Sequence, residues 1–182
     1  MAARAKPRPR KRPGKVATRT AAARPARRGG PPKGFHTLTP ELTVRGGLQA
    51  LDFYKRAFGA AELMRMPGPD GASLMHAELR IGDSIFFVSD ETPEMGNRSP
   101  QALGGTPASF YVYVDDVDRA FARAVNAGAQ VRMPVTNMFW GDRYGRLVDP
   151  FGHEWGLATR KEDLTPAQQR QRAAAFFSKT GR

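Results

Sequence analysis

The second half of this sequence repeats the first, and this repeat limits what the chain can fold into. The letters GAAELMRMP at residues 59–67 are echoed by GAQVRMP at residues 128–134, and LRIGDSIFFV at residues 79–88 by LVDPFGHEWGL at residues 147–157. An internal repeat of this kind indicates a duplicated supersecondary unit. Because each unit alone would expose one face of a sheet, the two units are expected to pair within the chain or across a dimer.

Hydrophobic periodicity predicts the same order of elements in both halves. For the first half it predicts a strand, a helix and three strands, at residues 37–44, 46–59, 61–67, 73–81 and 84–89. For the second half it predicts a strand, a helix and a strand at residues 109–114, 115–128 and 129–135, followed by two strands within residues 139–157. The predicted fold class is α+β, with two βαβββ modules pairing into a cleft-forming sheet.

The repeat also sets the predicted domain limits. One domain and one helical extension are expected, at residues 35–160 (repeats 37–89 and 108–159) and at residues 161–182. The extension is predicted to be helical because Thr165 and Pro166 are a good N-cap and first helical position. Its Phe176 and Phe177 are expected to pack on the domain or on a partner chain.

Residues 1–34 differ in composition from the rest of the chain. They hold twelve Lys or Arg and no acidic residue, which leaves seventeen basic and seventeen acidic residues in the remainder. Since the segment is rich in Pro, Ala, Gly and Arg, we expect it to be disordered. A solvated extension is the favoured interpretation. Non-specific binding of nucleic acid through residues 4–33, by counterion release, and a targeting role are the alternatives.

The composition favours a cytoplasmic protein. Cysteine is absent, which fits a reducing compartment. No apolar run reaches the ~18 residues that a membrane span needs. The start of the chain lacks the apolar stretch of a secretory signal, so no membrane partner is expected.

Several phrases of the sequence point to a family. The helix phrase ALDFYKRAFGA at residues 50–60 and the strand phrase VDPFGHEWGL at residues 148–157, within the doubled βαβββ order, resemble the vicinal-oxygen-chelate superfamily. That group includes glyoxalase I, extradiol dioxygenases and bleomycin-resistance proteins. FWGDRYG at residues 139–145 looks like its small bacterial bleomycin-resistance-like branch. The resemblance covers about residues 34–160 and implies the fold, but it implies little about activity, because this fold hosts many chemistries.

The resemblance also implies where a metal would be held. In metal-dependent members, the first and last strands of each module supply one His or Glu each, and the four ligands leave open positions for the substrate. The matching positions here are Thr39, Phe87, Ser109 and Gly156. These residue types cannot form such a site, so no metal cofactor is expected at these positions.

The apolar pattern supports this register, because side chains alternate between the faces of a strand. If Ser109 and Gly156 face the cleft, then Val112 and Leu157 face the helices, as a buried set should. An aromatic or cationic organic ligand suits such a cleft, and a dimer interface or a solvated sheet face is the alternative. The cleft-facing candidates are Thr39, Glu41, Thr43, Ile85, Phe87, Ser109, Tyr111, Tyr113 and Glu154.

Two further groups of polar side chains are candidates. His76 and Glu78 lie on one strand face and can act as base and orienter or as non-standard metal ligands, although a surface hydrogen bond is the more common role of such a pair. Trp140, Asp142 and Arg143 form a polar-aromatic cluster, in which Asp142 could hold Arg143 in place for a ligand or form a hairpin salt bridge with it.

The remaining histidines are not expected to bind a metal. His153 and Glu154 are neighbours, so on a strand they point to opposite faces and cannot share one ion. A structural role is predicted for His153, because it lies in the turn DPFGH. His36 borders the basic segment and is not expected to be a ligand.

Three hypotheses for function result. The leading one is a metal-free, homodimeric protein that binds a small organic molecule in a cleft without a covalent step. The second is a lyase, isomerase or dioxygenase that holds a divalent metal on non-standard ligands such as Glu41, His76 or Glu78. The third is a protein that the basic segment brings to nucleic acid.

Overall fold

The structure is a computed structural model that describes residues 29–180, for 179 and 180 the backbone alone. Residues 1–28 of the basic segment predicted at residues 1–34, and with them residues 4–28 of the region 4–33, therefore lie outside the described residues. Among the helices described, none is long and apolar enough to cross a membrane.

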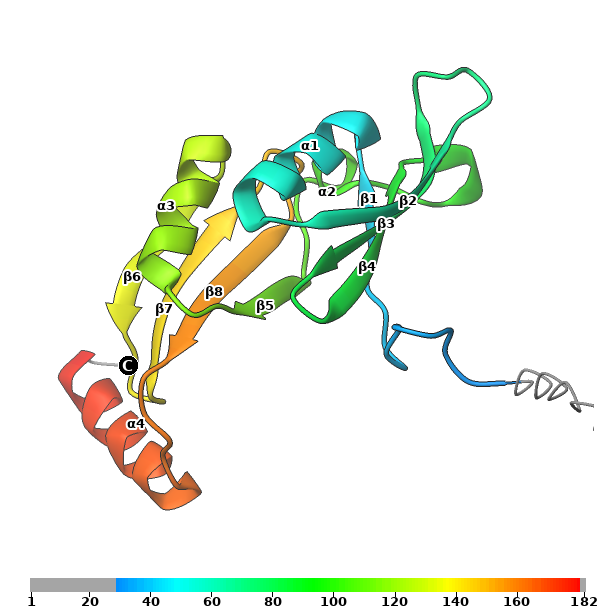
Figure 1. Cartoon of the computed structure of the whole chain (residues 1–182). Coiled ribbons are helices and arrows are strands. Elements are labelled where there is room, and N and C mark those ends of the chain that lie inside the picture. Colours follow the sequence, from blue (N-terminus) through cyan, green and yellow to red (C-terminus); the bar gives the residue numbers. More distant parts are fainter. Residues whose placement is uncertain (1–28, 181–182) are drawn as a thin grey trace, which may run out of the picture. The chain divides into compact units, whose positions relative to one another are not determined.

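The first module has the predicted βαβββ order (Figure 1). Its elements are β1 (Glu41–Val44), α1 (Gly47–Phe58), β2 (Ala61–Pro67), β3 (Leu74–Ile81) and β4 (Ser84–Asp90). The strands form a four-stranded sheet in the order β1-β4-β3-β2, in which β1 runs parallel to β4 and the other neighbours are antiparallel. Figure 1 shows α1 on one face of this sheet.

The second module repeats this topology. Its elements are β5 (Ser109–Tyr113), α3 (Val117–Ala127), β6 (Gln130–Asn137), β7 (Asp142–Val148) and β8 (Glu154–Arg160). The sheet order is β5-β8-β7-β6, again with one parallel pair, β5 and β8, and with α3 on one face. The duplication and the α+β class predicted from the sequence are thereby confirmed.

Some predicted boundaries were wrong. The strand expected at residues 37–44 is limited to Glu41–Val44, because Pro40 has no N–H for the ladder and contributes only its carbonyl, to the N–H of Phe87. Between the predicted strands at residues 84–89 and 109–114, where no element was predicted, lie two short helices, η1 (Pro93–Met95) and α2 (Pro100–Leu103). The predicted C-terminal helix is α4 (Pro166–Thr180).

Capping fixes where the two module helices begin and end. The carboxylate of Asp90, at the end of β4, accepts hydrogen bonds from the N–H groups of Gly46 and Gly47 at the start of α1 (2.8 and 2.7 Å). Asp116 accepts one from the Arg119 N–H at the start of α3. Both helices end at the predicted glycines, Gly59 and Gly128, which adopt the left-handed conformation.

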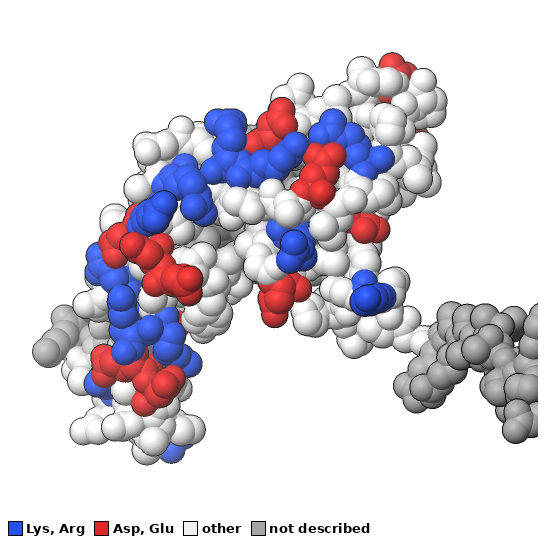
Figure 2. Space-filling model, viewed as in Figure 1, with Lys and Arg blue, Asp and Glu red and all other residues white. Residues whose placement is uncertain are grey.

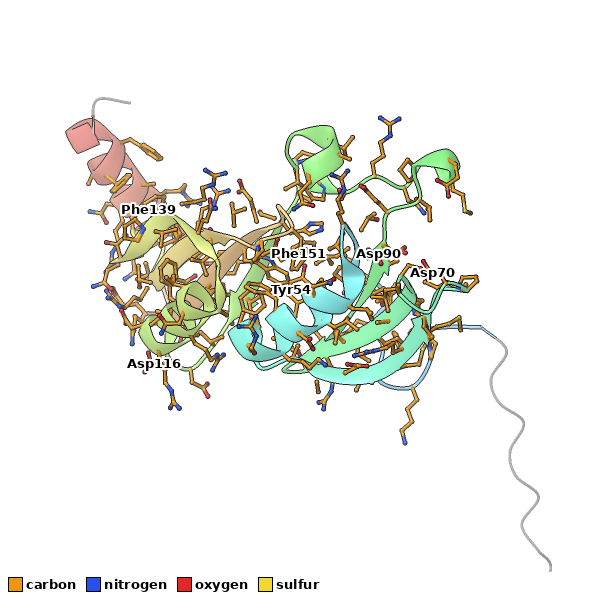
Figure 3. All side chains as sticks on the ribbon, turned by 90° about the horizontal axis from the view of Figure 1, so that it is seen from above. Tyr54, Asp70, Asp90, Asp116, Phe139 and Phe151 are labelled. Carbon is orange, nitrogen blue, oxygen red and sulfur yellow. The ribbon has the colours of Figure 1, made fainter. Side chains whose placement is uncertain are left out.

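The two modules share a core through their helices. Helix α1 packs against α3. Figure 3 shows Tyr54 of α1 beside Phe151. The ring centroid of Tyr54 lies 6.1 Å from that of Phe151 and 5.6 Å from that of Trp155. The buried carboxylate of Asp149 accepts hydrogen bonds from the Tyr54 hydroxyl and the Trp155 indole, both at 2.9 Å. Burial, and then the neighbouring Asp149, raise the pKa of Tyr54 well above its usual value, so the phenol stays protonated and donates.

His153 joins the modules by a second contact. Its ring is buried, and Nε2 lies 3.0 Å from the carbonyl oxygen of Thr43 in β1. A carbonyl only accepts, so this nitrogen carries the proton. The structural role predicted for His153 is confirmed, and its neighbour Glu154 points to the other face of β8.

The surface charge of the folded part is mixed. On the face shown in Figure 2, Lys and Arg side chains alternate with Asp and Glu side chains and do not form a patch of one sign. Glu62, for example, pairs with both Lys55 and Arg65 at 2.8 Å, and its bonds to Arg65 and then Lys55 lower its pKa to about 2. The excess of basic residues therefore lies in the N-terminal segment, as the composition indicates.

Candidate functional site

The candidate site lies on the face of the second sheet that points away from α3, here called the open face. Ser109, Tyr111 and Tyr113 of β5 pair with Glu154, Gly156 and Ala158 of β8. The alternate residues Trp155 and Leu157 are buried on the helix side. The register inferred from the apolar pattern is therefore confirmed for these strands.

The absence of a side chain at Gly156 makes room for an aromatic ring. A Cβ atom at this position would lie 2.6 Å from both Cε2 and the hydroxyl oxygen of Tyr144. The Tyr144 ring thus lies across β8 at Gly156 and stacks on Tyr111, with the centroids 5.0 Å apart and the planes 8° from parallel. The position where a metal-dependent relative would need a carboxylate is covered by this ring.

Asp142 organises the aromatic side chains around it. Its side chain is only 2% exposed, and Oδ2 accepts hydrogen bonds from the Tyr111 hydroxyl (2.8 Å), the Trp140 indole N–H (3.1 Å) and the Tyr113 hydroxyl (3.4 Å). Oδ1 accepts one from Arg160 Nη1 at 3.1 Å. Burial, and then the bond to Asp142, raise the pKa of Tyr111 far above its usual value, which keeps this phenol a donor.

The structure corrects one part of the predicted Trp140, Asp142 and Arg143 cluster. Trp140 and Asp142 do come together, but Arg143 does not bond to Asp142. Its guanidinium instead binds Asp118 of α3 at 2.6 Å, because consecutive residues of a strand point to opposite faces. Neither the predicted hairpin salt bridge nor the predicted support of Arg143 by Asp142 is present.

Two residues of the site were missed by the sequence analysis, Tyr144 and Arg160. Tyr144 lies two positions after Asp142 in β7, and strand periodicity alone could have placed both on one face. Arg160 lies opposite Asp142 only through the pairing of β7 with β8, which single-sequence patterns do not specify. Glu154 lies on the open face as predicted, and its carboxylate pairs with Arg146.

In the first module, the candidates His76, Glu78 and Phe87 also lie together. The His76 and Phe87 rings are 4.7 Å apart, and His76 Nε2 lies 3.9 Å from Glu78 Oε1. Glu41 is the strand partner of Phe87. Thr39 lies before β1, and its hydroxyl donates to the His36 carbonyl at 3.3 Å.

A divalent metal does not fit the four positions implied by the family resemblance. Phe87 has no donor atom, and Gly156 lies under the Tyr144 ring. Within residues 29–180, no three His, Asp or Glu side chains are close enough to one another to hold an ion. The residues at these positions therefore offer no ligand set for the metal chemistry of the wider family.

The open face continues into a groove along β5. This groove has a volume of about 760 Å³ and lies between β5 and the β3–β4 hairpin, with Phe110 and Val112 on one wall and Ile81 and Ile85 on the other. Strand β1 lies at one edge of the first sheet, beside β4, and β5 lies at one edge of the second sheet, beside β8. Among the described residues, no further strand pairs with β1 or β5, so each module ends in an edge strand at the equivalent place.

Comparison with known proteins agrees with this architecture. The family model described as the Glyoxalase/Bleomycin resistance protein/Dioxygenase superfamily matches residues 35–157. The chain belongs to this superfamily. The vicinal-oxygen-chelate resemblance read from the sequence is thus confirmed, and α4 lies beyond the matched residues.

Similar proteins are known in bacteria and plants. The chain is 50% identical over 123 residues to an uncharacterized protein of Mycobacterium tuberculosis, covering 66% of this chain and 72% of that one. Among solved structures, it resembles an Arabidopsis thaliana gene product (30% identity, TM-score 0.55, 68% of this chain and 98% of that one). It also resembles TioX from Micromonospora sp. ML1 (29% identity, TM-score 0.55, 71% and 100%). The fosfomycin resistance protein FosX of Listeria monocytogenes, at 14% identity and a TM-score of 0.53 over 74% and 97% of the two chains, shares the fold.

Proposed function

We propose that the protein binds a small organic molecule with an aromatic or cationic group on the open face of its second module, without a metal. The observation that supports this most is the set of tyrosine rings held around Asp142. Tyr111 and Tyr113 are 45% and 60% exposed, yet their hydroxyls are fixed by hydrogen bonds to a buried carboxylate. Exposed rings that are held in place form a preorganised stacking surface, which lowers the entropy cost of binding.

The metal-dependent alternative has less support. Of its non-standard ligands Glu41, His76 and Glu78, the last two lie 3.9 Å apart. No three His, Asp or Glu side chains of residues 29–180 come close enough together to hold an ion. Sequestration of a ligand needs no covalent step, and bleomycin resistance proteins, which give the family part of its name, are in line with such a role. The cytoplasmic location expected from the sequence is part of this proposal and rests on the composition alone.

A screen for stabilising compounds tests this function. Full-length protein is heated with a library of aromatic, cationic and neutral compounds, once with EDTA and once with Mn²⁺. Aromatic compounds should raise the melting temperature in a saturable way, equally in both buffers, because binding stabilises the folded state by mass action. Stabilisation that EDTA removes would favour the metal-dependent alternative, and Tyr111→Ala is the matched variant that should lose the shift.

We also propose that two copies of the chain assemble through the free edges of β1 and β5. Residues 109–113 of β5 read SFYVY, with no Pro, Lys or bulge to protect an edge strand from pairing. Light scattering coupled to gel filtration should therefore give about twice the chain mass of 20.0 kDa. A single-chain mass at micromolar concentration would contradict the dimer and leave the ligand proposal in place.

A further inference from the structure

The two carboxylate oxygens of Asp142 differ in how they are satisfied. Oδ2 receives three neutral donors, from Tyr111, Tyr113 and Trp140. At Oδ1, the hydrogen bond found within residues 29–180 comes from Arg160. A carboxylate that is 2% exposed is costly without a positive partner, so the place at Oδ1 requires a cation with an N–H group.

Arg160 donates to Oδ1 of Asp142 in a way that another cation could replace. Its side chain is 45% exposed, and it reaches Asp142 through one nitrogen and not as a bidentate pair. Its Nε already lies 3.6 Å from Asp163, whose carboxylate is 97% exposed. The pair with Asp163 is exposed and contributes little to stability, so it does not hold Arg160 in place. Because Asp142 is buried, Arg160 leaves it at small cost only when another cation takes its place at Oδ1.

There is also room for Arg160 to move. A second cavity, of about 420 Å³, is lined by Arg160 itself together with Tyr113, Thr159 and Asp115. Asp115 and Asp163 offer the guanidinium alternative acidic partners on this side. Asp142 has no such freedom, because it is buried and held by three donors.

We infer that Arg160 occupies a cation-binding position at Oδ1 of Asp142 when no ligand is bound. The ligand of the open face then carries an amidinium, guanidinium or primary ammonium group that replaces Arg160 at this oxygen. This inference rests on the proposed function and specifies its ligand class. The aromatic part of the ligand then lies on the tyrosine rings beside Asp142, where a cation over a ring face gains further attraction. A quaternary ammonium group is disfavoured because it cannot donate a hydrogen bond to Oδ1.

Arg160→Gln tests the exchange directly. The change removes the resident charge but keeps a side chain that can donate to Asp142. Binding of benzamidine to the full-length protein, measured by calorimetry, should tighten on the order of tenfold, or about 1.4 kcal/mol. Asp142→Asn should weaken benzamidine by a similar factor, and benzamide, the neutral analogue, should not bind Arg160→Gln more tightly. Arg119→Gln removes the same charge from the exposed surface of α3, behind the sheet, and is the matched control.

Different outcomes separate this inference from the proposed function. If benzamidine binds Arg160→Gln no better than the unmodified protein, the exchange is refuted, even where benzamide shows that the open face binds aromatics. If benzoate binds and Arg160→Gln abolishes it, Arg160 is an anion site and the inference is also refuted. If benzamidine, benzamide, benzoate and benzyltrimethylammonium all fail to bind, the proposed function itself loses support. If Asp142→Asn lowers the melting temperature so far that binding cannot be measured, the Arg160→Gln result alone shows whether the ligand replaces Arg160.

Discussion

Replacing Asp149 with alanine should lower the free energy of unfolding by about 4 kcal/mol or more, which approaches the whole stability of many domains. The carboxylate is buried and accepts four hydrogen bonds, from the Tyr54 hydroxyl, the Trp155 indole and the N–H groups of Phe151 and His153, each at 2.9 Å. Alanine would leave all four donors without an acceptor in the core. A buried donor without an acceptor costs about 1–3 kcal/mol, and these costs are not additive.

Urea unfolding followed by far-ultraviolet circular dichroism measures this change. Tyr54→Phe is the matched control, since it removes one of the four donors, keeps the ring and should cost about 1 kcal/mol. Asp149→Asn should fall between the two, because its amide oxygen still accepts two of the four hydrogen bonds while its NH₂ group faces the other two donors. An Asp149→Ala variant no less stable than Tyr54→Phe would show that this carboxylate does not hold the two modules together.

Gly156→Ala adds a single methyl group to the open face and should disturb the site strongly. The new Cβ would be placed 2.6 Å from the Tyr144 ring, so the ring must leave its stack on Tyr111. Overpacking of this kind costs about 1–3 kcal/mol. The stacking surface for a ligand should be lost together with this stability.

A double-mutant cycle isolates the contact. Tyr144→Ala removes the ring that the new methyl group would meet, so Gly156→Ala should cost much less on that background than on the unmodified one. The coupling is expected to be about 1–2 kcal/mol, measured by urea unfolding. Strictly additive effects would mean that Tyr144 does not lie over Gly156 in solution.

Much of the fold could be predicted from the sequence because several local signals agree. Periodicity, helix-ending glycines such as Gly128, and the repeated phrases all indicated the same βαβββ order. The boundaries were less accurate where a single residue changes the backbone hydrogen bonding, as Pro40 does at the start of β1. The short helix α2 did have a sequence signal, Ser99 followed by Pro100, a good N-cap and first helical position.

The site was harder to predict than the fold. The alternation of strand faces correctly separated His153 from Glu154, which contact Thr43 and Arg146 respectively. The grouping of Asp142 with Arg143 was wrong because proximity in sequence was given more weight than that same alternation. The partners of Asp142 come from β5, β8 and the turn before β7, and only the strand register brings such long side chains to one carboxylate.

Gly156 was informative in the sequence for what it lacks, a metal-binding side chain. The structure adds the physical reason for a glycine there, which is the close approach of Tyr144. Gly156 therefore lacks a metal-binding side chain and, for the same reason, leaves room for the aromatic ring that we propose contacts the ligand.

A calorimetric titration can show directly whether the open face binds its ligand without a metal. The best compound from the melting screen is titrated by calorimetry into full-length protein and into Tyr144→Ala, each in EDTA and in Mn²⁺. We expect the same affinity in both buffers and a loss on the order of tenfold in Tyr144→Ala, equivalent to about 1.4 kcal/mol of stacking. Binding that requires Mn²⁺, or that is unchanged in Tyr144→Ala, would contradict this expectation.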